Sequence, residues 1–283
     1  MSEQMDRTVL TPPAKLRISV VSNGNFQAMA MVRPLFDDDA FEIAGVAVVS
    51  VPPGPGGRFS TLVRLARRTG VRYTAYKLSS LLSARLATMG TTEPASLVGL
   101  CHERRVACRE LTSINTPSGD GFLRSLDADV LVSVSSPERF QTEILATARR
   151  AAINLHWGLL PRYAGIAPYF WCLKNGEKQA GLTVHLMVAE LDAGPVLRQR
   201  TVRIEPADSA FGLQMRLTVA GGEELHAAII DLAASVDTAR PQESVGRSYF
   251  SWPTPADVRI FRHAGRKLIR LRDLRELRRL ART

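Results

Sequence analysis

The feature that most constrains the fold is the alternation of short β-rich runs with stretches of helical spacing. Strand-like runs occur at 16–21, 41–50, 105–110, 129–134 and 152–155. Helical spacing separates several of them, at 26–32, 119–126 and 139–148. Strands that alternate with helices pair in parallel and carry helices on both faces of the sheet. The pattern therefore predicts an α/β protein with a doubly wound, mainly parallel sheet.

The downstream region completes this predicted core. Two further strand-like runs, at 182–187 and 196–204, are joined by the turn-forming residues 190–195. Residues 207–234 then have the spacing of one helix, for which Asp208 or Ser209 is the expected N-cap.

The chain divides by composition into four parts. Residues 1–15 are expected to form a flexible N-terminus, and residues 16–236 an α/β domain. Residues 60–100 lack strand alternation and mix apolar with basic side chains, which favours a helical insertion over one edge of the sheet. Residues 237–283 are interpreted as a polar linker followed by a basic C-terminal tail.

Composition excludes several classes of protein. Hydrophobic residues make up 45% and charged residues 23%, the balance of an ordinary globular chain. Three cysteines without a C-x-x-C pair indicate neither a disulfide framework nor a zinc site. No charged leader precedes an apolar stretch, and no apolar run approaches the length of a membrane span. A cytoplasmic location is therefore expected.

The positive charge gathers near the C-terminus. The formal net charge is +10, and eight of the last twenty residues are Lys or Arg. Residues 267–280 place leucines on one side of a helix, which favours docking on the chain's own domain or on a second subunit of a homodimer. Contact of this basic tail with RNA or with an anionic membrane surface is the open alternative, so the protein could be peripheral to the inner face of the membrane.

The residues that indicate chemistry are Asn154, His156 and Asp192. Asn154 and His156 end an apolar strand and point to the same side of it, and Asp192 lies in the turn 190–195. An amide can donate to an oxyanion, an imidazole can exchange a proton with an amine, and a carboxylate can orient the imidazole. The three groups together suit acyl transfer to a nitrogen nucleophile.

Three stretches around these residues resemble the folate-dependent formyltransferases, which include methionyl-tRNA, glycinamide ribonucleotide and sugar N-formyltransferases. They are INLHWGLLPRYAG (153–165), GLTVHLMVAELDAGPVL (181–197) and, more weakly, SNGNFQA (22–28). The resemblance implies a Rossmann-like sheet of the formyltransferase type, here with a helical insertion and a short C-terminal appendage. It also places the family's catalytic Asn, His and Asp on Asn154, His156 and Asp192, with the family's spacing of 38 residues.

The resemblance also implies a co-substrate, 10-formyltetrahydrofolate, and no metal. The pterin-binding walls, which act largely through backbone groups, correspond to two loops: Pro137, Glu138, Arg139 and Phe140, and Val188, Ala189 and Glu190.

Acceptor binding is expected at two other places. Asn23 and Asn25 stand before a helix whose N-terminus could hold a phosphate, although a plain strand-to-helix turn is the alternative. Arg162 and Tyr163 follow the His156 motif and are further candidates. His185 is interpreted as a packing residue, or as one that contacts the catalytic residues but not the substrate.

The favoured function is N-formylation, a one-carbon group transfer to a primary amine. The expected acceptor is a small molecule: a nucleotide- or lipid-linked amino sugar, or another biosynthetic amine. The alternatives are methionyl-tRNA formyltransferase activity, hydrolysis of formyltetrahydrofolate, and an inactive binding homologue; the short C-terminal tail argues against the first.

Overall fold

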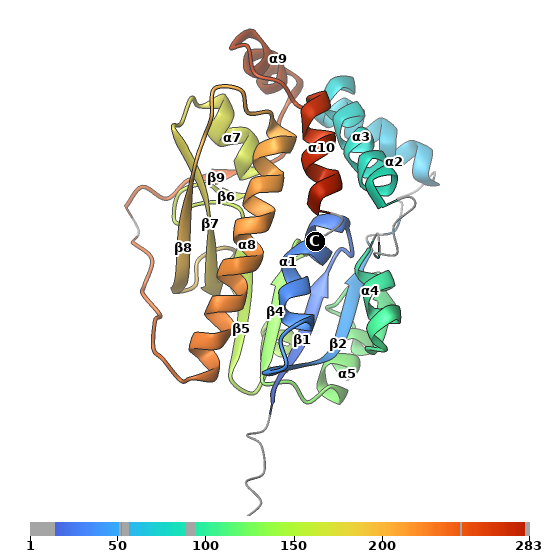
Figure 1. Cartoon of the computed structure of the whole chain (residues 1–283), viewed down its shortest axis with the longest axis vertical. Coiled ribbons are helices and arrows are strands. Elements are labelled where there is room, and N and C mark those ends of the chain that lie inside the picture. The colour runs from blue at the N-terminus through green and yellow to red at the C-terminus, as the bar shows by residue number, and fades with distance from the viewer. Residues whose placement is uncertain are drawn as a thin grey trace, which may run out of the picture.

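The computed structural model describes residues 15–50, 52, 57–88, 94, 96–243 and 245–280. The N-terminus expected to be flexible therefore lies, except for Lys15, outside the described residues. The centre of the protein is a seven-stranded sheet with the order β3-β2-β1-β4-β5-β7-β8 (Figure 1). Its strands are β1 (Leu16–Ser22), β2 (Phe41–Val49), β3 (Cys108–Leu111), β4 (Val130–Val134), β5 (Ala151–His156), β7 (Gln179–Leu186) and β8 (Val196–Arg203).

The sheet is mixed, and its two parts differ in direction. The first five strands in this order pair in parallel, whereas β7 runs antiparallel to β5, and β8 antiparallel to β7. A second, two-stranded sheet joins β6 (Ala164–Gly165) to β9 (Tyr249–Phe250). The expected doubly wound, mainly parallel α/β fold is confirmed, with an antiparallel edge.

Helices cover both faces of the sheet. On one face α1 and α8 pack together over the larger apolar core, and on the other α5 and α6 contribute Leu123 and Ile144 to a smaller core. The helices are α1 (Phe26–Phe36), α2 (Gly57–Thr69), α3 (Val71–Thr88), α4 (Leu97–Arg104), α5 (Pro117–Ser125), α6 (Thr142–Leu145), α7 (Pro168–Lys174), α8 (Ala210–Ala233), α9 (Pro255–His263) and α10 (Leu271–Leu280).

Two expected elements are shorter than predicted. The strand expected at 105–110 begins only at Cys108, because Arg105 ends α4 in the left-handed conformation, with φ of 55°. The helix expected at 139–148 shrinks to the four residues of α6. Its predicted first turn is an extended loop because the side chain of Asn115 donates to the carbonyl of Arg139 and accepts from the backbone N–H of Gln141.

The segment 60–100 and the tail meet at the end of the molecule where the parallel strands finish. Helices α2 and α3 form a hairpin about Gly70, whereas α4 buries Leu97 and Leu100 in the main core. Helix α10 packs against α3 and α8 (Figure 1). The buried carboxylate of Asp273 in α10 accepts a hydrogen bond from Ser209, the residue that caps α8. The basic tail thus docks on its own domain.

None of the described helices combines the length and the apolar character that a bilayer span requires.

Candidate active site

The candidate site lies where β5 ends, and three elements supply its side chains. Asn154 and His156 occupy the same side of β5, and the antiparallel register sets His185 of β7 opposite Asn154. Asp192 comes from the loop between β7 and β8. The expected trio therefore converges, with His185 as a fourth member.

His156 is held by the loop that follows its strand. The ring nitrogen Nε2 lies 2.8 Å from the carbonyl oxygen of Tyr163, and because a carbonyl only accepts, Nε2 carries the proton. The other nitrogen, Nδ1, then faces the Oδ2 atom of Asp192 at 3.8 Å. A Cβ at Gly158 would stand 2.7 Å from Nε2 and 2.5 Å from the Tyr163 carbonyl oxygen, so only glycine leaves room for this contact.

Asp192 is buried and conformationally constrained. Its backbone has a φ of 52°, which costs free energy for a non-glycine residue, although Asp tolerates this region better than most residues do. Its Oδ2 atom accepts a hydrogen bond of 2.9 Å from the backbone N–H of Gly165. Its Oδ1 atom lies 3.8 Å from Nε2 of His185, so the carboxylate stands between the two imidazoles.

His185 packs in the core and also forms two hydrogen bonds that bear on the site. Its Nδ1 donates to the carbonyl oxygen of Leu186 at 2.8 Å, which leaves Nε2 to accept from the amide nitrogen of Asn154 at 3.1 Å. Burial lowers the pKa of His185, an effect that the Leu186 carbonyl and the Asp192 carboxylate oppose. A neutral ring satisfies both hydrogen bonds, so His185 fixes the orientation of the Asn154 amide.

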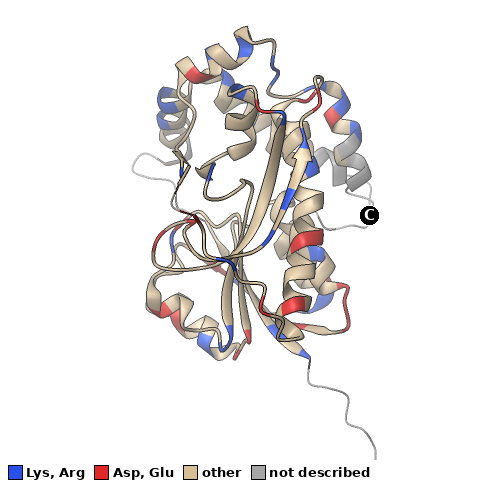
Figure 2. Cartoon of the chain, turned by 90° about the vertical axis from the view of Figure 1, so that its left-hand side faces the viewer, with Lys and Arg blue, Asp and Glu red and all other residues tan. Residues whose placement is uncertain are grey.

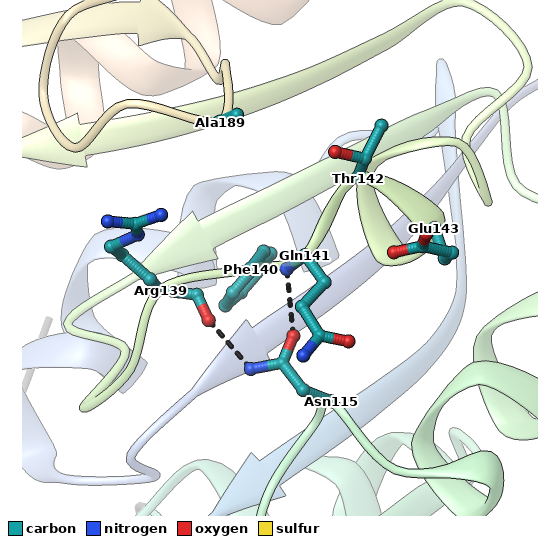
Figure 3. A pocket seen from close by; sticks show the side chains of 7 residues that line it. All are labelled: Asn115, Arg139, Phe140, Gln141, Thr142, Glu143 and Ala189. Carbon is teal, nitrogen blue, oxygen red and sulfur yellow. Dashed lines mark hydrogen bonds between the residues drawn. The ribbon is translucent and has the colours of Figure 1, made fainter.

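A pocket of about 410 Å³ is lined by residues of the two loops expected to hold the co-substrate (Figure 3). Its lining residues are Asn115, Arg139, Phe140, Gln141, Thr142, Glu143 and Ala189. Arg139 is exposed, and its guanidinium extends on the side where Ala189 lies (Figure 3). Phe140 contributes a buried apolar wall.

Other members of the two loops have structural partners. The carboxylate of Glu138 accepts hydrogen bonds from the backbone N–H of Ile114 and the hydroxyl of Ser113. Glu190 pairs with Arg247 at 2.9 Å. Pro137 and Val188 are exposed at the loop surfaces. The side chains of Glu138 and Glu190 are thus engaged within the protein, and the binding role of the two loops stays a prediction.

Comparison with known proteins agrees with this geometry. Residues 100–229 match the family model described as formyl transferase. This stretch, somewhat less than half of the chain, is a formyl transferase domain. One similar structure is phosphoribosylglycinamide formyltransferase from Anaplasma phagocytophilum, with 17% identity, a TM-score of 0.57, and coverage of 85% of this chain and 100% of that one.

Two sugar enzymes are similar to the same degree. The N-formyltransferase from Helicobacter canadensis, solved with folinic acid and dTDP-3-aminofucose, has 15% identity and a TM-score of 0.56, covering 83% of this chain and 71% of that one. WlaRD, a sugar 3N-formyl transferase solved with dTDP and 5-N-formyl-THF, has 16% identity and a TM-score of 0.55, covering 84% and 70%. At these identities the likeness concerns the fold.

The side chains of the four residues expected to bind the acceptor have partners within the protein. Asn25 caps α1 by accepting from Ala28 N–H at 2.8 Å, and Asn23 accepts from Asn25 N–H at 3.1 Å. Arg162 pairs with Glu177 at the surface. The hydroxyl of Tyr163 donates to Glu177 at 2.6 Å, and burial together with this carboxylate raises its pKa to about 12.

The segment expected to be a plain linker contributes to the formyltransferase site. Gln242 donates to the backbone carbonyls of Asp192 and Gly194 at 3.1 and 2.7 Å. Arg247 donates to the Leu191 carbonyl, and Ser248 accepts from the backbone N–H of Tyr163. These residues hold the loops that position Asp192 and His156. Their polar, irregular sequence gives no signal of this role, because the contacts join positions 48 or more residues apart.

Within the part of the chain that the structure describes, no cluster of three His, Cys, Asp or Glu side chains suits a metal ion.

Proposed function

We propose that this formyltransferase moves the formyl group of 10-formyltetrahydrofolate to the primary amine of a nucleotide- or lipid-linked amino sugar. The observation that carries the proposal is the convergence of Asn154, His156 and Asp192 at one strand end, with His185 orienting the amide. Two of the similar structures hold folate derivatives together with a thymidine nucleotide or nucleotide sugar, which supports both substrate classes.

The chemistry begins with attack of the amine nitrogen on the formyl carbon. A new C–N bond forms, and the carbonyl electrons move to oxygen to give a tetrahedral intermediate with a negative oxygen. One N–H of the Asn154 amide is committed to His185, and the second can donate to this oxygen. His156, when protonated at both nitrogens, can donate to the same oxygen while Tyr163 holds its Nε2–H.

Asp192 would take part in the proton transfer. The attacking amine gains a positive charge and must lose a proton before the intermediate collapses. The Asp192 carboxylate, 3.8 Å from each imidazole, can accept that proton directly or through water. Collapse breaks the bond between the formyl carbon and N10 of the folate, and N10 takes a proton as it leaves. The products are the formamide and tetrahydrofolate.

The pocket lined by the two loops suits the co-substrate. Its volume of about 410 Å³ lies within the usual range for small-molecule sites. Arg139 stands exposed on its rim, and no carboxylate of the described residues forms an ion pair with it. This cation would complement the carboxylates of the glutamate moiety of the folate.

The test is release of tetrahydrofolate from 10-formyltetrahydrofolate by the purified chain. The panel comprises nucleotide-linked amino sugars, an undecaprenyl-linked amino sugar, glycinamide ribonucleotide, methionyl-tRNA and buffer alone. We expect release to depend on an amino sugar and to disappear in Asp192→Asn. Release in buffer alone, or with methionyl-tRNA only, would refute the proposed acceptor class. If the chain binds folate normally but releases no tetrahydrofolate with any member of the panel, the proposed turnover is refuted.

A further inference from the structure

The positive charge of the chain belongs to two segments that lie side by side. Residues 57–88 hold seven Lys or Arg and no Asp or Glu, and residues 255–283 hold ten against three. The rest of the chain carries 20 basic and 24 acidic residues, so it is slightly acidic. Because α10 packs on α3, the described parts of both basic segments occupy one end of the molecule (Figure 1). Figure 2 shows that Lys and Arg predominate over Asp and Glu toward the upper end of the view.

The hairpin α2–α3 also exposes large apolar side chains at this end. We define the α2–α3 surface by the exposed residues Phe59, Leu62, Val71, Leu78, Leu81 and Leu82. Phe59 is 78% exposed and Val71 75%. Exposed apolar residues of this number on two adjoining helices are unusual for a surface that meets only water.

The apolar residues of α3 follow the helical repeat. Val71, Ala75, Leu78 and Leu82 are all exposed and are spaced by four, three and four residues, so they form one stripe along the helix. Helical spacing places Arg72 and Lys77 on either side of this stripe. An apolar stripe with basic borders is the arrangement of helices that lie in the interface of an anionic bilayer.

The inner face of the same helix is anchored in the protein. Tyr73 and Tyr76 are buried, and Tyr73 packs edge-on against Phe170 of α7 at 5.7 Å. Tyr76 donates to Gln214 of α8 at 3.3 Å. The outer stripe is therefore displayed by a fixed scaffold, and α3 need not leave the fold to expose it.

We propose that the α2–α3 surface binds the surface of an anionic lipid bilayer, with the apolar stripe of α3 in the interface and the neighbouring arginines on the headgroups. Charge complementarity selects this occupant over a second copy of the chain, since two copies would bring the same positive segments together. An RNA backbone would satisfy the arginines, but it offers nothing to the exposed aliphatic side chains.

The experiment measures flotation of the full chain with vesicles of phosphatidylcholine, alone or mixed with about one-third phosphatidylglycerol. We compare Leu78→Gln/Leu82→Gln and Arg67→Gln/Arg72→Gln with two matched controls at other surfaces. The apolar control is Ile230→Gln/Val236→Gln, and the charge control is Arg109→Gln/Arg203→Gln, all of them exposed positions. Thermal unfolding by circular dichroism verifies that each variant is folded.

We expect the wild type and both controls to float with the anionic vesicles only. Each α2–α3 variant should bind roughly tenfold or more weakly, because each headgroup contact and each buried leucine contributes to binding. Equal flotation of folded variants and controls would overturn the proposal. So would RNA binding without vesicle binding, or a dimer, seen by light scattering, that Leu78→Gln/Leu82→Gln dissociates while no vesicle binding occurs. The measurement involves no turnover, so its result is independent of the acceptor assay.

Discussion

Two strand ends at the same edge of the sheet carry similar polar residues and use them differently. After β1, the side chains of Asn23 and Asn25 accept hydrogen bonds from backbone N–H groups two and three residues away. At the end of β5, which only β4 separates from β1, Asn154 and His156 face His185 and Asp192 from distant parts of the chain. The first strand end is a capped turn and the second is the candidate site.

The difference lies in how close each polar group is to an unsatisfied backbone donor. A helix begins directly after Asn25, and its free N–H groups compete for any side-chain oxygen nearby. No helix follows β5 directly. In the loop after His156, the carbonyl of Tyr163 accepts a hydrogen bond from His156, and the N–H of Gly165 donates one to Asp192. Side chains that local backbone does not engage remain available for a substrate.

The largest expected effect on turnover is that of a substitution at Asp192, which belongs to the second of the two strand ends. Asp192→Asn keeps the shape but loses the negative charge between the two imidazoles, so we expect turnover to fall roughly 10²- to 10⁴-fold. The measurement is kcat for tetrahydrofolate release, beside a melting curve. Asp39→Asn, at an exposed position between β1 and β2, is the matched control and should retain wild-type kcat. Near-normal turnover of Asp192→Asn would exclude it from the mechanism.

Asn154→Ala should have the next largest effect. It removes the amide proposed to donate to the oxyanion, and loss of one such donor lowers kcat about 10²- to 10³-fold. The KM for the amine should change little, because the contact strengthens only as negative charge develops on oxygen. A change confined to KM would show that Asn154 binds the ground state instead.

A local sequence pattern predicts the strands that lead to these two ends, but not what the polar residues at each end contact. The apolar runs predict the strands, whereas the resemblance to a known family singles out Asn154, His156 and Asp192; whether these three side chains are catalytic stays a prediction. Whether an asparagine caps a helix, or whether Gln242 reaches the Asp192 loop 50 residues away, depends on backbone geometry that no local pattern encodes. The helix expected at 139–148 is longer than the observed α6 for the same reason, since Asn115 holds the preceding loop from a distance in the sequence.

The third prediction concerns the pH dependence of the free energy of unfolding, which tests whether His185 is neutral in the folded protein. Burial lowers its folded pKa below the unfolded value of about 6.5. Between these two values the unfolded chain binds a proton that the folded chain does not, so the free energy of unfolding falls as pH decreases below about 6.5. The slope is at most about 1.4 kcal/mol per pH unit. Urea unfolding at several pH values measures it.

His185→Gln provides the matched comparison for that slope. The variant has no titrating ring, so its slope in this window should be smaller than that of the wild type. Carboxyls with lowered pKa, such as Asp129, act only in a lower window, below pH 4. Identical slopes in the two proteins would mean that folding leaves the pKa of His185 unshifted, which would contradict a neutral ring held by burial.

The smallest expected effect is that of a substitution at Asn25, and its result could contradict the distinction between the two strand ends. Asn25→Ala removes the N-cap of α1, so the free energy of unfolding should fall by about 1 kcal/mol. If Asn25 only caps the helix, kcat and the KM for the amine acceptor stay at wild-type values when measured well below the melting temperature. Asn25→Ser restores a capping oxygen with a shorter side chain and should recover the stability. An increase in acceptor KM that Ser does not rescue would show that this turn binds substrate, and the two strand ends would then form one continuous site.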